Sequence, residues 1–211
     1  MVPRVVPEYK EQATKKILEA ARSVFAEKGY HDARMEDIAE LVGVSKRTLY
    51  LYFTNKEELF AAICAEAPRT MQVVMDSTLG KPQDIQDFPS MMEGLFDKLL
   101  ENQFAGSGPG SINEIRLNYE MILAASRNPS LKKIIRESSE KEMEILTAFI
   151  QNLRERGLLR SSLKPSVLAR AIFAIYPGLI GDIIVGVDKS EVRKTWVDTI
   201  RTLVGEPPIK K

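Results

Sequence analysis

The sequence contains few residues of the kinds that build covalent cross-links, metal sites or acid–base catalysts. Its 211 residues include one cysteine, Cys64, and one histidine, His31. A single cysteine cannot form an internal disulfide, and this pair supplies too few ligands for a zinc site. With His31 as the one histidine, the sequence shows no complete Ser/His/Asp arrangement. We therefore predict no catalytic residue, no metal and no cofactor.

The chain also lacks an excess of charge and an uninterrupted apolar run. Lys and Arg number 30 against 29 Asp and Glu, so composition alone indicates neither a nucleic-acid nor a membrane partner. The most apolar stretch, 167–187, is interrupted by Arg170, Pro177 and Asp182, whereas a membrane span needs about 20 apolar residues. The N-terminus has no apolar core of a secretory signal. We expect a cytoplasmic protein without a membrane partner.

Apolar residues recur at three- and four-residue intervals along most of the chain, and strand-like alternation is absent. The pattern predicts an all-α protein of about nine helices. Turn-rich segments at 80–89 and 105–111 separate helices expected at 111–127, 129–156, 165–186 and 189–204. We predict a helix-turn-helix domain at 1–55, with a flexible arm at 1–8, and a helical effector-binding and dimerisation domain at 56–211.

Capping signals divide the first 60 residues into short helices. Gly29 is expected to end the first helix, and Gly43 the second. Ser45 stands at the N-cap of a third helix. Asn55, followed by Glu58 three residues on, is typical of the start of a longer helix. Two short helices joined by a glycine turn predict a helix-turn-helix.

The third of these helices has a one-sided charge. Residues 41–56 contain Lys46, Arg47 and Lys56 and no Asp or Glu, although residues 1–60 hold ten cations and ten anions. The second helix of a helix-turn-helix enters the major groove, where guanine offers two acceptors and phosphates repel carboxylates. Two adjacent cations alone would suit an ordinary solvated face equally well. Combined with the turn and the cap they favour DNA binding, with Leu49 and Phe53 in the core.

The segment ILEAARSVFAEKGYHDARMEDIAELVGVSKRTLYLYFTNKEELF, from Ile17 to Phe60, resembles the N-terminal signature of the TetR family of bacterial transcriptional regulators. The parts DIAELVGVS and LYLYFTNKEEL stand at the spacing usual in that family. The resemblance implies a homodimeric all-α regulator with a three-helix DNA-binding head and a fourth helix as connector. It also implies a C-terminal body that binds a small molecule.

The resemblance implies which residues contact the DNA. The residues that match the groove-facing positions of the family are Ser45, Lys46, Arg47 and Thr48. Those that match its positions in contact with the DNA backbone are Tyr50, Tyr52 and Lys56. Where the family commonly begins its second helix with threonines, this chain has Ala33 and Arg34. We expect Arg34 to supply the phosphate contact and Asp32 the cap. Leu51 either touches a thymine methyl or packs.

The body offers candidate residues for an effector site. The predicted lining is Met71, Met75, Met92, Phe96, Asn113, Arg116, Tyr119, Phe173 and Tyr176, with Met121 as a further apolar candidate. Methionines adapt to irregular shapes, so a mainly apolar ligand is expected. An apolar stripe at helical spacing equally fits plain core packing. Arg116 either holds an acidic headgroup or pairs with Glu120 one turn on.

The last two expected helices are apolar on more than one side, which indicates a partner surface. The predicted dimer residues are Ile172, Ile175, Leu179, Ile183, Trp196, Ile200 and Leu203. A two-fold dimer predicts a pseudo-palindromic double-stranded operator. We expect a repressor whose effector shifts the fourth helix, with Pro68 as a candidate bend. The alternative is a helical ligand-binding or scaffolding protein whose head contacts protein.

Overall fold

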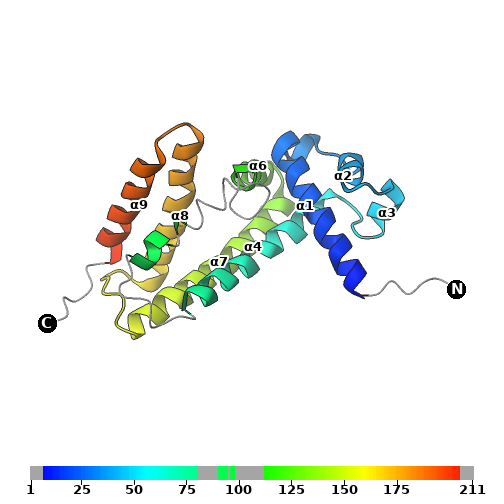
Figure 1. Ribbon diagram of the computed structural model, residues 1–211. Coiled ribbons are helices and arrows are strands. Elements are labelled where there is room, and N and C mark those ends of the chain that lie inside the picture. The colour runs from blue at the N-terminus through cyan, green and yellow to red at the C-terminus, as the bar shows by residue number, and fades with distance from the viewer. Residues whose placement is uncertain (1–6, 80–89, 95, 98–111, 205–211) are drawn as a thin grey trace. The chain divides into compact units, whose positions relative to one another are not determined.

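A computed structural model describes residues 7–79, 90–94, 96–97 and 112–204 of the chain. Within these residues the regular elements are helices, and strands are absent. The labelled helices (Figure 1) are α1 Pro7–Asp32, α2 Met35–Val42, α3 Lys46–Tyr50, α4 Lys56–Leu79, α6 Ile112–Arg127, α7 Pro129–Glu155, α8 Pro165–Ile184 and α9 Lys189–Val204. Residues 90–94 and 96–97 are also helical. The all-α prediction is confirmed.

Several predictions on chain connections fall outside the described residues. The turn-rich segments 80–89 and 105–111 lie there, as do residues 1–6 of the predicted N-terminal arm. The last two arm residues, 7 and 8, belong instead to α1, which begins at Pro7. The expected arm is therefore two residues shorter than predicted at its C-terminal end.

The chain divides into two compact units, and each is described by itself. The first unit contains the described residues of Met1–Glu66 and Asn113–Glu137. The second contains those of Ala67–Ile112 and Ser138–Lys211. The first unit thus joins α1, α2 and α3 to the start of α4, most of α6 and the start of α7. Helices α4 and α7 contribute residues to both units.

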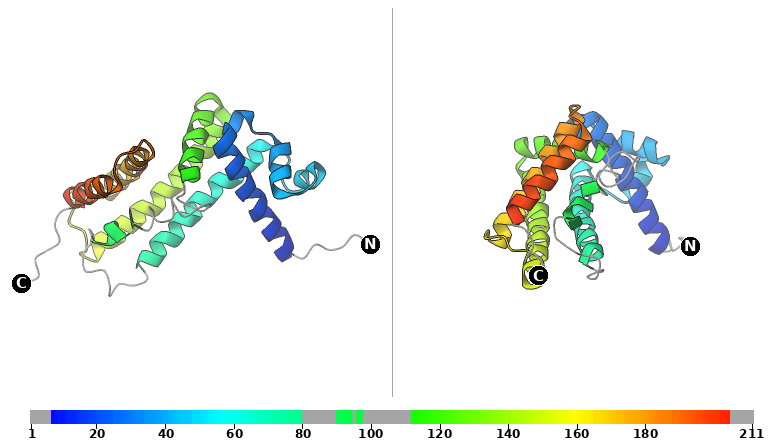
Figure 2. Two further views of the ribbon diagram at one scale, coloured as in Figure 1. Left: turned by 45° about the horizontal axis from the view of Figure 1, so that its top comes forward. Right: turned by 60° about the vertical axis from the view of Figure 1, so that its left-hand side comes forward.

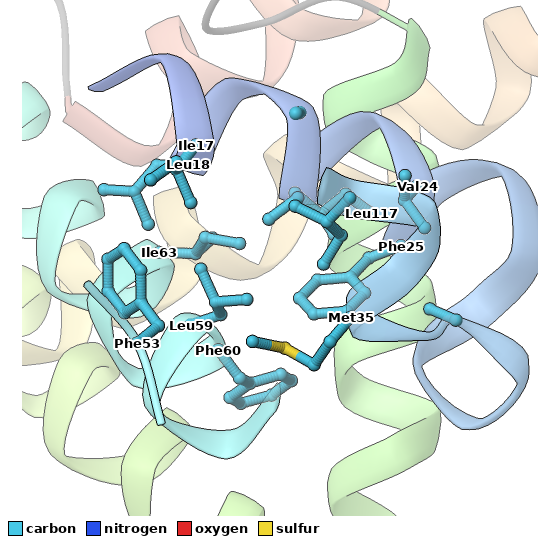
Figure 3. Close-up of a cluster of buried hydrophobic side chains, with 14 of the residues drawn as sticks. Ile17, Leu18, Val24, Phe25, Met35, Phe53, Leu59, Phe60, Ile63 and Leu117 are labelled. Atoms are coloured by element: carbon cyan, nitrogen blue, oxygen red, sulfur yellow. The ribbon is translucent and has the colours of Figure 1, made fainter. Parts of the chain in front are cut away.

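A single apolar cluster forms the core of the first unit (Figure 3). Phe25 of α1 and Leu59 and Phe60 of α4 have no exposed surface, and Met35 of α2 lies among them. Burial of each such side chain contributes roughly 1.5–3 kcal/mol. Helix α6 joins the same cluster through Leu117, Met121 and Ala125, and α7 joins it through Leu131. Met121, expected at the effector site, is therefore part of this core.

The capping predictions around α2, α3 and α4 are confirmed. Gly43 follows α2 with φ 79°, and its N–H donates to Ala39 O at 3.0 Å. The Ser45 Oγ accepts the N–H of Thr48 at 3.0 Å, which closes the start of α3. The Asn55 Oδ1 accepts the N–H of Glu58 at 2.9 Å before α4. These three caps fix where the short helices begin and end.

The structure describes two positions where a break or a bend was predicted. Gly29 breaks α1 as predicted, because its φ of 73° is non-helical, and a further short helical piece runs from there to Asp32. The positive φ favours glycine at this position, where a Cβ would lie 2.9 Å from the Glu120 Oε2 at the end of a flexible side chain of α6. Pro68, the candidate bend, is buried inside α4, which continues past it to Leu79.

In the second unit, α8 and α9 lie side by side (Figure 2). The Trp196 ring of α9 stacks on Phe96 with centroids 5.0 Å apart, and its Nε1 donates to Met92 O at 3.1 Å. Helix α8 is strongly apolar, with a mean hydropathy of 1.7 over 18 residues, yet only 22% of that stretch is buried. By length and composition alone α8 could cross a membrane, but core helices of water-soluble proteins meet the same criteria.

Candidate nucleic-acid interface

Helix α3 presents hydrogen-bond donors on a firmly anchored support. Leu49 is completely buried and Phe53 is 7% exposed, so the predicted core role of both is confirmed. Lys46 and Arg47 are exposed in the first turn. The Ser45 Oγ and Thr48 Oγ1 lie 2.8 Å apart in the cap. A short helix held by two apolar side chains can therefore offer its first turn to a ligand.

The residues at the end of α3 differ in exposure. Tyr50 is 40% exposed, and the Lys46 Nζ lies 5.8 Å from its ring centroid. Tyr52 is half-buried and packs against the core of the first unit. Leu51 is 76% exposed. This exposure removes the interpretation that Leu51 packs within its own chain.

An ion pair joins Lys46 to Glu36, a residue that sequence reasoning missed. Glu36 lies in the first turn of α2, and the hydrogen bond from Lys46 holds the pKa of its carboxyl below the usual range. The same contact raises the pKa of Lys46. Residues 41–56 contain no acid in the sequence, but in the folded chain the carboxylate of Glu36 lies beside Lys46. Glu36 stands ten residues before Lys46, and only the turn between α2 and α3 brings them together.

Lys56, the first residue of α4, is bound to the end of α1. Its Nζ donates to Tyr30 O at 2.6 Å and to His31 O at 2.9 Å, and it lies 4.8 Å from the Tyr30 ring centroid. Partial burial lowers the pKa of Lys56. The ammonium therefore neutralises carbonyl dipoles at a helix C-terminus, in addition to any contact it makes with a ligand.

The start of α2 is capped differently from the prediction. Arg34 is the N-cap residue, and its N–H donates to the Asp37 Oδ2 at 3.0 Å. Asp37 also pairs with Lys28 at 2.9 Å, which with the bond from Arg34 lowers the pKa of its carboxyl. Asp32, the expected cap, is the last residue of α1. The cap comes from within α2 because its third residue carries a carboxylate that reaches back.

A hollow of about 520 Å³ lies where the end of α1, the start of α2 and the start of α4 meet. It brings together Arg34 and Lys56, two of the predicted DNA-binding cations. The remaining lining residues are His31, Asp32, Ala33, Met35 and Glu36. The hollow therefore holds charges of both signs, and it shares Glu36 with the ion pair at the first turn of α3.

Comparison with known proteins identifies the head. The family model described as "Bacterial regulatory proteins, tetR family" matches residues 17–63, which contain most of α1, all of α2 and α3, and the start of α4. The chain belongs to the TetR family. It is therefore a DNA-binding transcriptional regulator of the helix-turn-helix type. Regulators of this family bind DNA and small-molecule ligands.

Relatives and solved structures extend the likeness beyond the head. YfiR, an uncharacterized HTH-type transcriptional regulator of Bacillus subtilis (strain 168), is 26% identical over 165 residues, which are 78% of this chain and 75% of YfiR. A TetR-family regulator from Agrobacterium tumefaciens is 14% identical and has a TM-score of 0.72, with 93% of this chain and 100% of that chain covered. FadR from Bacillus subtilis, solved with stearoyl-CoA, is 20% identical with a TM-score of 0.68, covering 90% of this chain and 97% of FadR.

The predicted effector residues are divided between the two units. Asn113, Arg116 and Tyr119 belong to the first unit, where the last two are exposed. The other six belong to the second unit: Met75, Met92 and Phe96 are buried in its core, and Met71, Phe173 and Tyr176 are half-buried. Phe96 and Tyr176 are in contact, with ring centroids 6.2 Å apart.

The second unit also has an open groove of about 650 Å³ that includes none of these nine residues. The groove lies along α7 and the start of α8, and its lining is Met143, Glu144, Thr147, Ala148, Gln151, Lys164, Pro165 and Ser166. The predicted pocket wall and this groove are therefore different places within the second unit.

Three of the predicted dimer residues already have partners inside their own chain. Ile172, Trp196 and Ile200 are 5%, 2% and 1% exposed in a single chain, so they have almost no surface to offer a second copy. Their assignment to a contact surface is corrected to the core, because α8 and α9 pack against each other there. The half-buried residues Ile175, Leu179, Ile183 and Leu203 keep part of their surface.

A further group that the sequence did not single out is Glu142 of α7. Burial raises the pKa of its carboxyl to about 7. A carboxyl held in this way changes charge near neutral pH. The local sequence KEMEI contains no sign of this burial.

Proposed function

We propose that this TetR-family regulator is a cytoplasmic repressor that binds a pseudo-palindromic double-stranded operator as a homodimer and is released by a small, mainly apolar molecule. One observation carries the DNA-binding part. The first turn of α3, closed by the Ser45 cap, leaves Lys46 and Arg47 exposed above the buried Leu49. This arrangement suits entry of a helix N-terminus into the major groove.

The contacts divide by chemistry. Lys46 and Arg47 supply donors for guanine O6 and N7, and the Ser45 and Thr48 hydroxyls serve either bases or phosphates. Tyr50 and Tyr52 contact the sugar-phosphate backbone beside α3. Arg34 and Lys56 approach a phosphate from the hollow at the start of α2 and α4, where two helix N-termini also favour an anion.

The dimer is proposed from the surface of α8. A helix with mean hydropathy 1.7 of which only 22% is buried has apolar area to cover, and a second copy covers it symmetrically. The contact residues are Ile175, Leu179, Ile183 and Leu203, with Val167 and Ile184, which are 50% and 40% exposed. Two-fold symmetry then places the two recognition helices near 34–36 Å apart, one turn of DNA.

We assign effector binding and dimerisation to residues 56–211 and DNA contacts to residues 1–55 and Lys56. An apolar effector is supported by the methionine and aromatic residues of the second unit, and stearoyl-CoA is the ligand of the FadR structure. Transmission to the head uses helices that are part of its core: α4 through Leu59, α6 through Leu117 and α7 through Leu131. The effector must bind the two head arrangements with different affinity for release to occur.

Selection from a random duplex pool tests the proposal directly. The full-length protein should enrich a pseudo-palindrome, bind it as a dimer in sedimentation, and be displaced by apolar molecules in a release screen. The double variant Lys46→Ala, Arg47→Ala should enrich nothing, while the control Arg156→Ala, which changes an exposed cation directly after α7, should behave as wild type. A wild-type protein that enriches no duplex, or a double variant that selects the wild-type sequence, would overturn the proposal.

A further inference from the structure

The Lys46–Glu36 ion pair lies at an exposed position, where it adds little to the stability of the fold. The two side chains are 56% and 52% exposed, and exposed ion pairs contribute little to folding. Lys46 is the first residue of α3, so a carboxylate beside it faces the phosphates of any DNA that α3 enters. Such a carboxylate weakens binding to a polyanion in general. The Glu36 carboxylate therefore lowers the affinity for DNA, and a gain in selectivity for one sequence would explain why it stands there.

The pair offers a donor and an acceptor at one place. The Lys46 Nζ carries three N–H groups, and the Glu36 Oε1 in contact with it accepts hydrogen bonds. The ring of Tyr50, 5.8 Å from the same Nζ, lies on α3 as well. The ammonium is thus held between groups from α2 and α3, which limits the positions from which it can reach a base.

The major-groove edge of a G·C pair has the complementary pattern. Guanine presents two acceptors, N7 and O6, and the N4 amino group of cytosine follows as a donor. A lysine can take both guanine acceptors while a glutamate accepts from cytosine N4. An A·T pair interposes the adenine N6 donor between two acceptors, so one acceptor would face the carboxylate.

We infer that Glu36 is a specificity-determining residue: together with Lys46 it reads one G·C base pair in each half-site, and its charge suppresses binding to other sequences. The inference rests on the proposed DNA-binding function and names a base pair that α2 and α3 recognise jointly. Glu36 acts on the bases directly through cytosine N4 and on the phosphates by repulsion.

The test compares Glu36→Gln with wild type in the full-length protein, by duplex selection and then by titration of the enriched duplex and of single-pair variants. Glutamine keeps the shape of the side chain and removes its charge. We expect wild type to prefer G·C over A·T at one position of each half-site by about 5- to 100-fold. In Glu36→Gln this preference should fall to a few-fold, and affinity for a random duplex should rise several-fold.

Glu40→Gln is the matched control, because Glu40 is an exposed acid one turn further along α2 and carries the same charge. It should keep the wild-type preference. A Glu36→Gln variant with unchanged base preference and unchanged random-duplex affinity would overturn the inference, as would a wild-type preference for A·T at every position that Lys46→Ala affects. Thermal unfolding of each variant confirms that the comparison is between folded proteins.

The two levels of the argument fail in different ways. If wild type enriches no duplex at all, the proposed function is wrong and the inference falls with it. If wild type enriches an operator that Glu36→Gln reads identically, the DNA-binding function stands and only the role of Glu36 is wrong.

Discussion

The two units of this regulator differ in how their functional residues relate to their cores. In the first unit the residues proposed to contact DNA are polar or charged, and Lys46, Arg47 and Tyr50 are exposed above a core of other residues. In the second unit the candidate residues are mostly apolar, and Phe96 and Trp196 turn out to be core. A polar or charged residue in a sequence is seldom part of the core, so it can be assigned to a binding surface. An apolar residue fits either the core or a binding surface, so the sequence alone does not decide its role.

Trp196→Ala should have the largest effect on stability. The side chain is 2% exposed, stacks on Phe96 and donates to Met92 O, so its removal leaves a cavity and an unpaired carbonyl. We expect the free energy of unfolding to fall by about 3–5 kcal/mol, measured by urea denaturation at one fixed protein concentration. Trp196→Phe, which keeps a ring, should lose clearly less.

Failure of the Trp196→Ala prediction would contradict the contrast between exposed DNA-contact residues in the first unit and buried candidate residues in the second. A Trp196→Ala variant that unfolds like wild type but sediments as a monomer would return Trp196 to the dimer interface. The second unit would then expose its functional residues as the first unit does.

Glu142→Gln should stabilise the protein above neutral pH. The pKa of Glu142 is raised to about 7 in the folded chain from an ordinary 4.5, so the folded state binds the proton more tightly. The free energy of unfolding of wild type therefore falls as pH rises from 4.5 to 7. At pH 8 the variant should be more stable by roughly 1–3 kcal/mol, and at pH 4 the difference should vanish.

Urea titrations at the two pH values measure the difference, with Glu144→Gln, an exposed neighbour on α7, as the control. Equal gains for both variants, or a Glu142→Gln gain independent of pH, would contradict the burial of this carboxyl. A confirmed gain would sharpen the comparison, because it places an ionisable group inside the second unit.

Arg47→Ala should separate binding from folding in the first unit. Because the side chain is exposed, the free energy of unfolding should stay within about 0.5 kcal/mol of wild type. Affinity for the selected operator should fall about 10-fold for one lost contact, as measured by fluorescence anisotropy. A loss of stability equal to the loss of affinity would mean that Arg47 supports the head and does not read DNA.

Lys56→Met should have a small effect on both properties. Its ammonium donates to Tyr30 O and His31 O, so the variant should lose about 1 kcal/mol of stability. Because Lys56 is also proposed to contact a phosphate, affinity should fall alike for all sequences, and the slope of log K against log salt should decrease in magnitude by about 0.9. An unchanged slope with reduced stability would leave Lys56 as a brace between α1 and α4 only.

The sequence predicted the helices well because their signals are local. The bounds of α6, α7, α8 and α9 lie within two residues of the prediction. Gly43, Ser45 and Asn55 act within four residues of where they stand, so their caps could be foreseen. The break at Gly29 could be predicted from the glycine itself, whereas the short helical piece that follows it to Asp32 could not.

The candidate site was less predictable where it depends on contacts between helices. Glu36 meets Lys46 only through the turn between α2 and α3, and Lys56 meets Tyr30 across 26 positions of sequence. The core role of Trp196 follows from Phe96, which stands 100 positions earlier. The local pattern around each residue was compatible with a core position or with a contact surface. Helical periodicity shows that one face of a helix is covered, but it does not show which part of the protein covers it.

The most direct test of the central claim is the salt dependence of binding to the duplex that wild type enriches. The account predicts that log K falls linearly with log salt, with a slope of about −0.9 per phosphate contacted. The variant Lys46→Ala, Arg47→Ala should lose most of the affinity while unfolding like wild type. Absence of any enriched duplex, or binding that does not change with salt or with these two residues, would contradict the assignment of α3 as the DNA-reading helix.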